Sequence, residues 1–393
     1  MVVNRNVPEL ILQNEKWDEE RRKSILQAFE EEVYGCSPKD GFSVSWNIVK
    51  EEPFKNIGTK RVVEIYIDAP KGRHSFLLYV FIPKTASQHN PVPVMLSISI
   101  TPRFPQPSGM VNGKELDELL KVVGDRVETL PTPSELPKPE PYDLENNTND
   151  EKWPVEVLLS KGYATAAFYA EDIGPDNETK YQEGIISYFE DNKEAPNSWG
   201  TIAAWAFGAS RAIDYLTTDS LLDKSKISVI GHSRGGKTAL WCAANDPRVY
   251  CCYANNSGCT GAALSRGKKG EDVFCINTIF PYWFCENYKK YNNREDTLPV
   301  DQHMLLASIA PRLLYLASAS EDLWADPESE FYSAVLASEV YEYYGLRGLE
   351  KKSPLKPGQK THKGRIGYHV RKGRHELTLH DWELFCEFLE SKR

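Results

Sequence analysis

The chain has 393 residues, of which 41% are hydrophobic and 26% are charged, an ordinary composition for a globular protein with one large core or two smaller ones. Its formal net charge of −9 argues against an electrostatic grip on nucleic acid or on anionic lipid, and leaves neutral glycans open as ligands. No run approaches about 18 consecutive apolar residues, so the sequence predicts no membrane span.

The cysteines are scattered and most lie in apolar runs, without a CxxC pair or a Cys/His spacing typical of a metal site. Their positions are 36, 242, 251, 252, 259, 275, 285 and 386. This pattern predicts buried, reduced thiols and no bound metal. The first residues, MVVNRNVPELILQNEKWDEERR, lack the apolar centre of a signal peptide. We therefore expect a cytoplasmic protein, or a secreted one if a leader has been removed.

The N-terminal third predicts one helix followed by strands. Residues 16–34 have the pattern of an amphipathic helix, and residues 60–69 and 74–83 predict a β-hairpin. Residues 92–100, PVPVMLSIS, predict a buried strand. Residues 102–142 then contain eight prolines and little periodicity, too long a stretch for a plain connection, so we expect a functional loop or lid near the active site within an insertion at 102–150.

Beyond the insertion, predicted strands and helices alternate. The strands are YATAAFYA, ISVIGHS, VYCCYANNSG, RLLYLAS and IGYHVRKGRH, and the helices include NSWGTIAAWAFGASRAIDYL, GGKTALWCAAN, FYSAVLASEVYEYYG and TLHDWELFCEFLE. Alternation with near-continuous apolar strands predicts a mostly parallel sheet covered by helices on both faces, a three-layer α/β sandwich. Because no interdomain linker is visible, we expect residues 1–393 to form a single domain.

Residues 231–235, Gly-His-Ser-Arg-Gly, fit the G-x-S-x-G pattern between an apolar strand and a helix, as a nucleophile elbow requires. Gly231 and Gly235 allow a tight turn that exposes the Ser233 hydroxyl at the N-terminus of the helix. The Arg234 amide then points to where an oxyanion would form. The alternative is a chance match to a common pattern.

A nucleophilic serine needs a histidine base, which in the α/β-hydrolase architecture follows both the serine and the acid along the chain. His375 fits, because it follows the last predicted strand and precedes the last helix; the alternative is a surface turn histidine. The other seven histidines fit less well, because they precede Ser233 or the strand before the acid, lie in a polar loop, or lie inside the last predicted strand or helix. Their positions are 74, 89, 232, 303, 362, 369 and 380.

The acid should lie in the loop ASEDLWADP, just beyond the strand RLLYLAS. Asp322 fits best and Glu321 second, while Asp326 precedes a proline and has the pattern of a helix N-cap. The acid would hold the tautomer of His375 and stabilise its protonated form.

Several ordered motifs resemble the glucuronoyl esterases, carbohydrate esterases with the α/β-hydrolase fold. GHSRGGK matches the family's S-R-x-G-K signature, and the likeness continues in NNSGCTGAALSR, LPVDQHMLLASIAPR, SEDLWADP and GRHELTLHDW. The likeness covers roughly residues 150–390 and is strongest to bacterial members. Together these motifs are far more specific than the elbow alone.

The resemblance implies further roles. Arg234 would contribute its side chain as well as its amide to the oxyanion, Lys237 would hydrogen-bond sugar hydroxyls, and Trp324 would wall the sugar site. The alternatives are an ion-paired or surface arginine, a solvated helix lysine and a core tryptophan. Apart from the resemblance, we expect a further oxyanion amide from the loop after the strand PVMLSIS, near Thr101–Arg103.

Two departures from the family pattern stand out. Fungal members carry the acid directly before S-G, where this chain has Asn256, so Asp322 is favoured as in some bacterial members. The substrate-contacting glutamine ahead of the Trp-Phe pair is missing, because the run is FPYWF with Pro281 and Tyr282.

We predict a serine carboxylic-ester hydrolase that cleaves uronic acid (4-O-methyl-glucuronoyl) esters of plant cell-wall glycans in two acyl-transfer steps, without a metal or organic cofactor. The alternatives are an acetyl xylan esterase or carbohydrate deacetylase on the same scaffold, and a non-catalytic binding protein. The expected partner is a small glycan or glycan ester, bound by a monomer.

Overall fold

The structure, a computed structural model, describes residues 5–12, 16–101, 103, 110–111, 114–115, 141–189 and 195–392. Most of the insertion predicted at 102–150 therefore lies outside the described residues, including the proline-rich part to which a lid was assigned. None of the helices in these ranges is long and apolar enough to cross a membrane.

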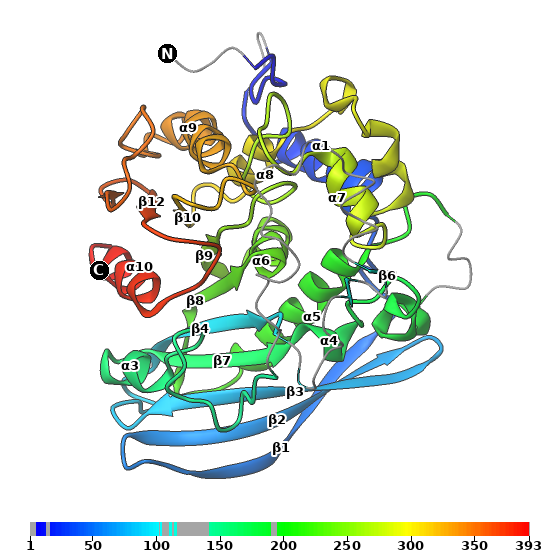
Figure 1. Cartoon of the computed structure of the whole chain (residues 1–393). Helices are drawn as coiled ribbons and strands as arrows, with labels where there is room; N and C mark the ends of the chain where they lie inside the picture. Colours follow the sequence, from blue (N-terminus) through cyan, green and yellow to red (C-terminus); the bar gives the residue numbers. More distant parts are fainter. Residues whose placement is uncertain are drawn as a thin grey trace.

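A ten-stranded sheet forms the centre of the described structure, in the order β1-β2-β3-β7-β4-β8-β9-β10-β12-β11 (Figure 1). The six strands from β7 to β12 in this order are parallel, and the strands at both edges are antiparallel. Their bounds are β1 (Ser43–Phe54), β2 (Gly58–Ala69), β3 (Gly72–Pro83), β4 (Val92–Ser99), β7 (Ala164–Tyr169), β8 (Leu222–His232), β9 (Val249–Asn255), β10 (Leu313–Ala319), β11 (Lys360–Thr361) and β12 (Ile366–Arg371). A separate pair, β5 (Met110–Val111) and β6 (Lys114–Glu115), is antiparallel. The predicted mostly parallel sheet is confirmed.

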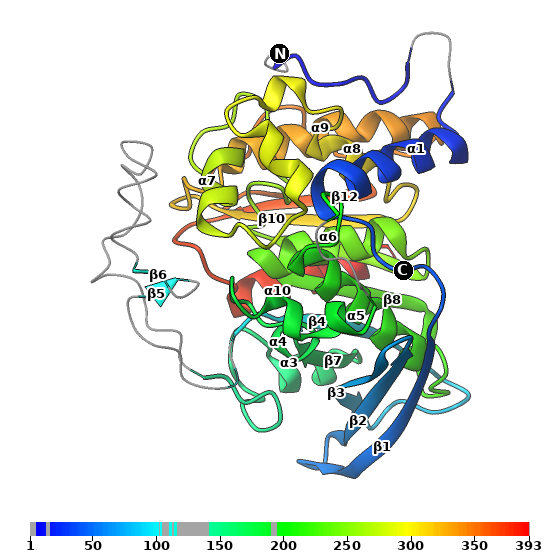
Figure 2. The same cartoon turned by 90° about the vertical axis from the view of Figure 1, so that its right-hand side faces the viewer.

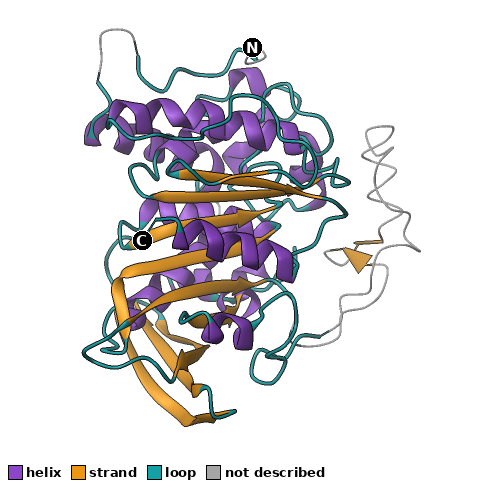
Figure 3. Ribbon diagram, turned by 90° about the vertical axis from the view of Figure 1, so that its left-hand side faces the viewer, coloured by secondary structure: helices purple, strands orange, loops and turns teal. Residues whose placement is uncertain are grey.

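Helices lie on both faces of the sheet (Figure 3). The longer ones are α1 (Glu19–Phe29), α3 (Val155–Ser160), α5 (Thr201–Leu216), α6 (Arg234–Asn245), α7 (Val273–Ile279), α8 (Gln302–Ala307), α9 (Pro327–Tyr343) and α10 (Leu379–Glu390). The other helical segments are the short helix α4 (Ala170–Ile173), the π-helical turn η1 (Glu30–Tyr34) and the 3₁₀ turns η3 (Tyr181–Glu183), η4 (Ile185–Tyr188), η5 (Glu286–Tyr291) and η6 (Glu295–Thr297). Figure 1 shows α3 and α10 on one side of the sheet and α5 and α6 on the other.

The two faces of the sheet bury two separate apolar clusters. Successive residues of β8 point to opposite faces, so Val229 packs in the cluster under α1, α5, α6, α8 and α9, and Ile230 packs in the cluster under α3 and α10. Both side chains are fully buried, which explains why the central strands are continuous apolar runs rather than alternating patterns. The result is the predicted three-layer α/β sandwich.

The N-terminal segment differs in two ways from what its sequence predicts. The expected hairpin exists as β2 and β3, but a further edge strand, β1, pairs with β2 and curves away from the main sheet (Figure 2). Most of β1 is exposed, so its sequence lacks the buried face that would have marked it as a strand. The helix expected over 16–34 is α1 from Glu19, followed by the π-helical turn η1.

The parallel strands bring four loops together at one edge of the sheet. Within the ladder His232 pairs with Asn255, Asn255 with Ala317, and Ala319 with Arg371. Because the strands run parallel, the residues that follow each of them emerge at the same edge, where ligands bind in open α/β sheets. The candidate nucleophile, acid and base follow β8, β10 and β12.

Candidate active site

The turn at Ser233 has the strained backbone of a nucleophile elbow. Ser233 has φ 56° and ψ −127° and precedes the first residue of α6. A Cβ atom at Gly231 would lie 1.9 Å from the carbonyl oxygen of Gly235, so the turn can close only without a side chain there. The amide of Ser233 donates to the Asn255 carbonyl at 2.9 Å, which ties the elbow to the end of β9.

The predicted acid and base are hydrogen-bonded to each other. His375 Nδ1 lies 2.6 Å from Asp322 Oδ2, and the Asp322 side chain is 5% exposed. Burial raises the pKa of Asp322, but the hydrogen bond and charge of His375 and the Ala325 amide outweigh it and hold the pKa below its usual range. The carboxylate therefore stays ionised beside the imidazole.

The competing acids have other surroundings. Glu321 is exposed, and its amide donates to the Gly373 carbonyl at 2.9 Å. Asp326 caps α9, because its Oδ1 accepts the Ser329 amide at 3.1 Å. The N-cap predicted for Asp326 is confirmed, and Asp322 is the acid of this loop that contacts His375.

His375 lies beside the residue that precedes Ser233. The rings of His232 and His375 are 4.5 Å apart between centroids. Within the described part of the chain, the Ser233 hydroxyl makes no hydrogen bond, so its pairing with His375 stays a prediction. Hydrogen bonds of this kind are often long in an unliganded enzyme and tighten with substrate.

His232 is chemically distinct from His375. Burial, and then the neighbouring charge of His375, lower the pKa of His232 to about 3. Its Nδ1 lies 2.6 Å from Asn255 Oδ1, and Asn255 donates its amide N–H to the Tyr253 hydroxyl at 3.2 Å. His232 is therefore neutral near pH 7 and its Nδ1 is already hydrogen-bonded, so His375 stays the candidate base.

A buried guanidinium fixes the loop that carries His375. One nitrogen of Arg371 donates to the Arg374 carbonyl at 2.7 Å and to the Glu376 carbonyl at 2.9 Å, on either side of His375. Arg371 Nε in turn donates to Asp381 at 3.1 Å. Asp381 is fully buried and also accepts the Thr378 amide at the start of α10. The position of His375 thus rests on the Arg371–Asp381 pair.

The acid loop and the base loop are joined directly. The Ser320 amide donates to the Arg371 carbonyl at 2.8 Å, and the Glu321 amide donates to Gly373. Gly373 has φ 117°, a conformation that favours glycine, and a Cβ atom there would lie 2.8 Å from Arg371. The two loops therefore act as one support for the hydrogen bond between Asp322 and His375.

The Arg234 side chain is held beside the elbow by Asp176. Arg234 Nε lies 2.6 Å from Asp176 Oδ2, and another nitrogen donates to the Ile100 carbonyl at 3.3 Å. The other oxygen of Asp176 accepts the Tyr282 hydroxyl at 2.6 Å and the Trp283 indole N–H at 2.8 Å. Arg234 is therefore ion-paired, which the sequence analysis gave as an alternative to the oxyanion role. The ion pair holds its side chain in a fixed position next to Ser233.

Lys237 is buried rather than solvated. Its side chain is 5% exposed, and Nζ donates to the carbonyls of Ser257 and Cys259, each at 2.6 Å. Glu271 lies 3.9 Å from the same ammonium. Burial lowers the pKa of Lys237 and raises that of Glu271, and each charge opposes the shift of the other. Two of the three ammonium N–H bonds are used within the protein.

Trp324 lies at the surface of the same region, partly exposed. Its side chain packs against the small cluster of Cys275 and Ile279, and its carbonyl accepts the Glu271 amide at 3.0 Å. The structure therefore groups Trp324 with Lys237 through Glu271.

Asn256 occupies the position where fungal relatives were expected to have their acid. It has φ 45° and is buried, and within the described chain neither its side-chain oxygen nor its nitrogen has a hydrogen-bond partner. The loop at residues 101–103 was predicted to supply a further oxyanion amide. Thr101 and Arg103 of this loop are described, and Arg103 forms an ion pair with Asp172 at 2.9 Å.

Sequence reasoning missed Asp176, Glu271, Arg371 and Asp381. The available signal for Asp176 was the acidic run EDIGPD directly after the strand YATAAFYA, at the edge of the sheet where sites form. Glu271 lies in the polar run RGKKGED, and nothing in that run marks it as buried.

Comparisons with known proteins agree on one family. The family model described as "Glucuronyl esterase, fungi" matches residues 130–345. Carbohydrate esterase MZ0003, from an unknown prokaryotic organism, is 36% identical over 380 residues, covering 95% of this chain and 85% of that protein.

Solved structures give the same result. The glucuronoyl esterase from Solibacter usitatus has a TM-score of 0.81 at 34% identity, with 98% of this chain and 97% of that chain covered. A promiscuous CE15 esterase from a marine bacterial metagenome has a TM-score of 0.81 at 35% identity, with the same coverage. The fold is the α/β-hydrolase fold, and the chain belongs to the glucuronoyl esterase family of carboxylic-ester hydrolases.

Proposed function

We propose that this protein hydrolyses glucuronoyl esters of plant cell-wall glycans, with Ser233 as nucleophile, His375 as general base and acid, and Asp322 as the carboxylate that orients His375. The observation that carries the proposal is the Asp322–His375 hydrogen bond of 2.6 Å, formed next to a strained serine elbow. Relatives named 4-O-methyl-glucuronoyl methylesterase, such as that of Schizophyllum commune at 32% identity over 50% of this chain and 53% of that protein, support the substrate class.

The reaction proceeds in two acyl transfers. His375 takes the proton of the Ser233 hydroxyl as the oxygen attacks the ester carbonyl, and the resulting oxyanion is stabilised by the Arg234 amide and guanidinium. The tetrahedral intermediate collapses, and the alcohol leaves with the proton from His375. Water, deprotonated by His375, then attacks the acyl-enzyme and releases the uronic acid.

Arg234 suits the oxyanion role because its position is fixed before substrate arrives. The ion pair with Asp176 and the bond to Ile100 hold the guanidinium beside the elbow, so little reorganisation is needed as negative charge develops. The same ion pair reduces the net positive charge at the site, so the stabilisation comes mainly from directed N–H groups.

The uronate ring would lie against Trp324, whose partly exposed indole offers an apolar face to a pyranose. Lys237 would offer its one remaining N–H, and its main contribution would be to hold the loop of Ser257 and Cys259 in place. The carboxylate of Glu271, whose amide donates to the Trp324 carbonyl, would accept a sugar hydroxyl.

The experiment compares two substrates side by side with the purified protein: benzyl glucuronate and an acetylated xylo-oligosaccharide. A higher kcat/KM on the uronate ester is expected. A preference for the acetyl ester would overturn the substrate assignment and leave a deacetylase that uses the same serine machinery.

We further propose that the enzyme is a monomer of the cytoplasm. In support of a reducing compartment, the eight cysteines are free thiols in the described structure, and all except Cys36 are buried. Light scattering that gave twice the chain mass would contradict the monomer, and secretion of the full-length gene product would contradict the compartment.

A further inference from the structure

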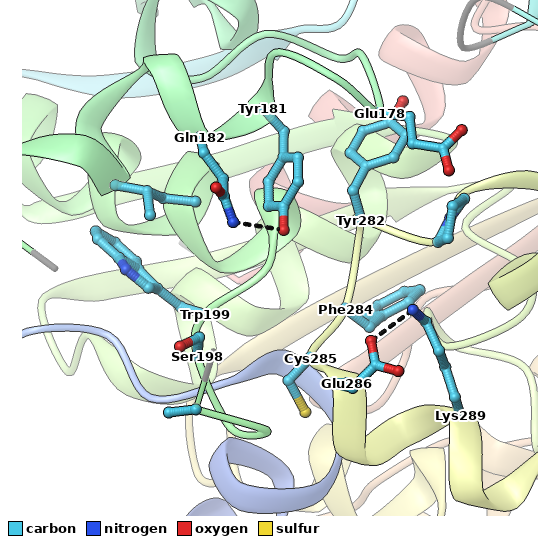
Figure 4. A pocket seen from close by; sticks show the side chains of 13 residues that line it. Glu178, Tyr181, Gln182, Ser198, Trp199, Tyr282, Phe284, Cys285, Glu286 and Lys289 are labelled. Atoms are coloured by element: carbon cyan, nitrogen blue, oxygen red, sulfur yellow. Dashed lines mark hydrogen bonds and ion pairs between the residues drawn. The ribbon is translucent and has the colours of Figure 1, made fainter. Parts of the chain in front are cut away.

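The structure has a cavity whose described lining contains none of the residues proposed for catalysis. It has a volume of about 210 Å³ and is lined by the turn η3, the segment around Trp199 and the segment from Pro281 to Lys289 (Figure 4). This is below the roughly 300 Å³ at which pockets for drug-sized ligands begin. The cavity therefore suits a single ring better than a whole oligomer.

The floor of this cavity is aromatic. Trp199 and Tyr282 are buried at 1% and 2% exposure, and Phe284 lies beside them. The rings of Tyr181 and Tyr282 face each other with centroids 5.6 Å apart and planes tilted by 36°. Because Trp199 and Tyr282 are almost fully buried, these rings shape the floor of the cavity, and the surface that the cavity exposes is mainly polar.

The rim of the cavity is polar. Gln182 donates its amide N–H to the Tyr181 hydroxyl at 2.9 Å, and Lys289 pairs with Glu286 at 2.5 Å (Figure 4). Glu178 also lies on the rim. These amide, hydroxyl and carboxylate groups offer both donors and acceptors to a ligand with several hydroxyls.

The rim is charged as well as polar. Glu178, Glu286 and Lys289 line the cavity, and Lys289 pairs with Glu286. A wholly apolar aromatic alcohol would leave the polar rim without partners. A neutral pyranose, whose hydroxyls both donate and accept hydrogen bonds, would satisfy them.

The cavity shares a residue with the catalytic site. Tyr282, in the floor, donates to one oxygen of Asp176, and the other oxygen of Asp176 pairs with Arg234 beside Ser233. The cavity thus begins two polar contacts away from the proposed oxyanion group.

We infer that this cavity is an accessory subsite for a neutral pyranose unit of the glycan that carries the ester. The inference rests on the proposed function for its connection to catalysis, but not for binding itself. It makes Gln182 and Lys289 specificity residues for long substrates, remote from the reacting atoms.

The first test is kinetic. We compare benzyl glucuronate with the same uronate ester carried on a xylo-oligosaccharide, in the wild type, Gln182→Ala and Lys289→Ala. The variants should raise KM for the glycan-borne ester about fivefold, roughly the effect of one neutral hydrogen bond, and leave kcat/KM for benzyl glucuronate unchanged. Lys290→Ala is the matched control, since Lys290 is an exposed neighbour that lies outside the cavity lining.

The second test measures binding without turnover. Xylotriose is titrated into Ser233→Ala and into Ser233→Ala/Gln182→Ala, with saturation-transfer NMR and calorimetry as readouts. Binding to the first protein that weakens about fivefold in the second supports the subsite, even if neither ester is hydrolysed and the proposed function has failed. Absence of xylotriose binding in a protein that does hydrolyse glucuronate esters, or equal changes in KM for both esters, would overturn it.

Discussion

Replacing Asp322 by Asn tests the acid directly, because the amide keeps the shape of the side chain and removes its charge. When His375 accepts the serine proton, it becomes a cation 2.6 Å from the Asp322 oxygen. At an effective dielectric constant of about 20, that separation corresponds to about 6 kcal/mol of attraction, part of which the amide dipole restores. We expect kcat to fall about 10³- to 10⁴-fold with KM nearly unchanged.

The assay is steady-state hydrolysis of benzyl glucuronate, with circular dichroism and thermal unfolding to confirm that the variant folds. Glu321→Gln is the matched control, because Glu321 precedes Asp322 in the same loop but is exposed. Its kcat should stay within about twofold of the wild type, as is usual for exposed sites. A folded Asp322→Asn variant that keeps more than about a tenth of kcat would refute the reasoning, and so would a large loss in Glu321→Gln.

Three further predictions concern the surrounding structure. Arg371→Met should lower the free energy of unfolding by about 3 to 5 kcal/mol, because it breaks a buried ion pair, and should lower kcat about tenfold without changing KM, because His375 loses its support. Asp176→Asn should lower kcat about tenfold, because it releases the guanidinium of Arg234 from its fixed position. Burial lowers the pKa of His303 in the folded protein, so the unfolded chain binds more protons than the folded one below pH about 6.5. The contribution of His303 to the free energy of unfolding should therefore be fully present above that pH. Below it, the free energy of unfolding should fall by up to about 1.4 kcal/mol per pH unit for each such histidine.

Matched variants separate these effects from general damage. Lys372→Met replaces an exposed neighbour of Arg371 and should leave stability and kcat unchanged. An Arg371→Met variant that loses stability but keeps full kcat would show that His375 does not depend on it. An Asp176→Asn variant with full kcat would show that catalysis does not depend on the ion pair between Asp176 and Arg234. For the pH effect, denaturant titrations measure the free energy of unfolding of His303→Gln and of His89→Asn, which replaces an exposed histidine. If this free energy changed equally with pH below 6.5 in both variants, the pH effect would not come from His303.

The residues near Ser233 were predictable because their chemistry is local in sequence. A G-x-S-x-G turn needs its glycines within two residues of the serine, and the apolar runs on either side set the strand and the helix. The parallel sheet followed from the alternation of such runs. The chain order of serine, acid and histidine then directed attention to the loops that carry Asp322 and His375, which the structure joins by a hydrogen bond.

The supporting residues could not be predicted because they depend on contacts between distant segments. Asp176 and Tyr282 are 106 positions apart, and their hydrogen bond holds the partner of Arg234. The burial of Lys237 is set by carbonyls twenty and more residues away, and helical spacing alone suggests a solvated side chain. Strand β1 was missed for another reason: it is an exposed edge strand, so its sequence carries no one-sided apolar pattern.

Ser233 is the proposed nucleophile of glucuronoyl ester hydrolysis. The most direct measurement is the rate of benzyl glucuronate hydrolysis by Ser233→Ala beside the wild type and Ser160→Ala, which replaces an exposed serine at the end of α3. We expect full activity in the wild type and in Ser160→Ala, and a loss of at least about 10³-fold in a folded Ser233→Ala protein. Turnover in Ser233→Ala within about tenfold of the wild type would contradict it.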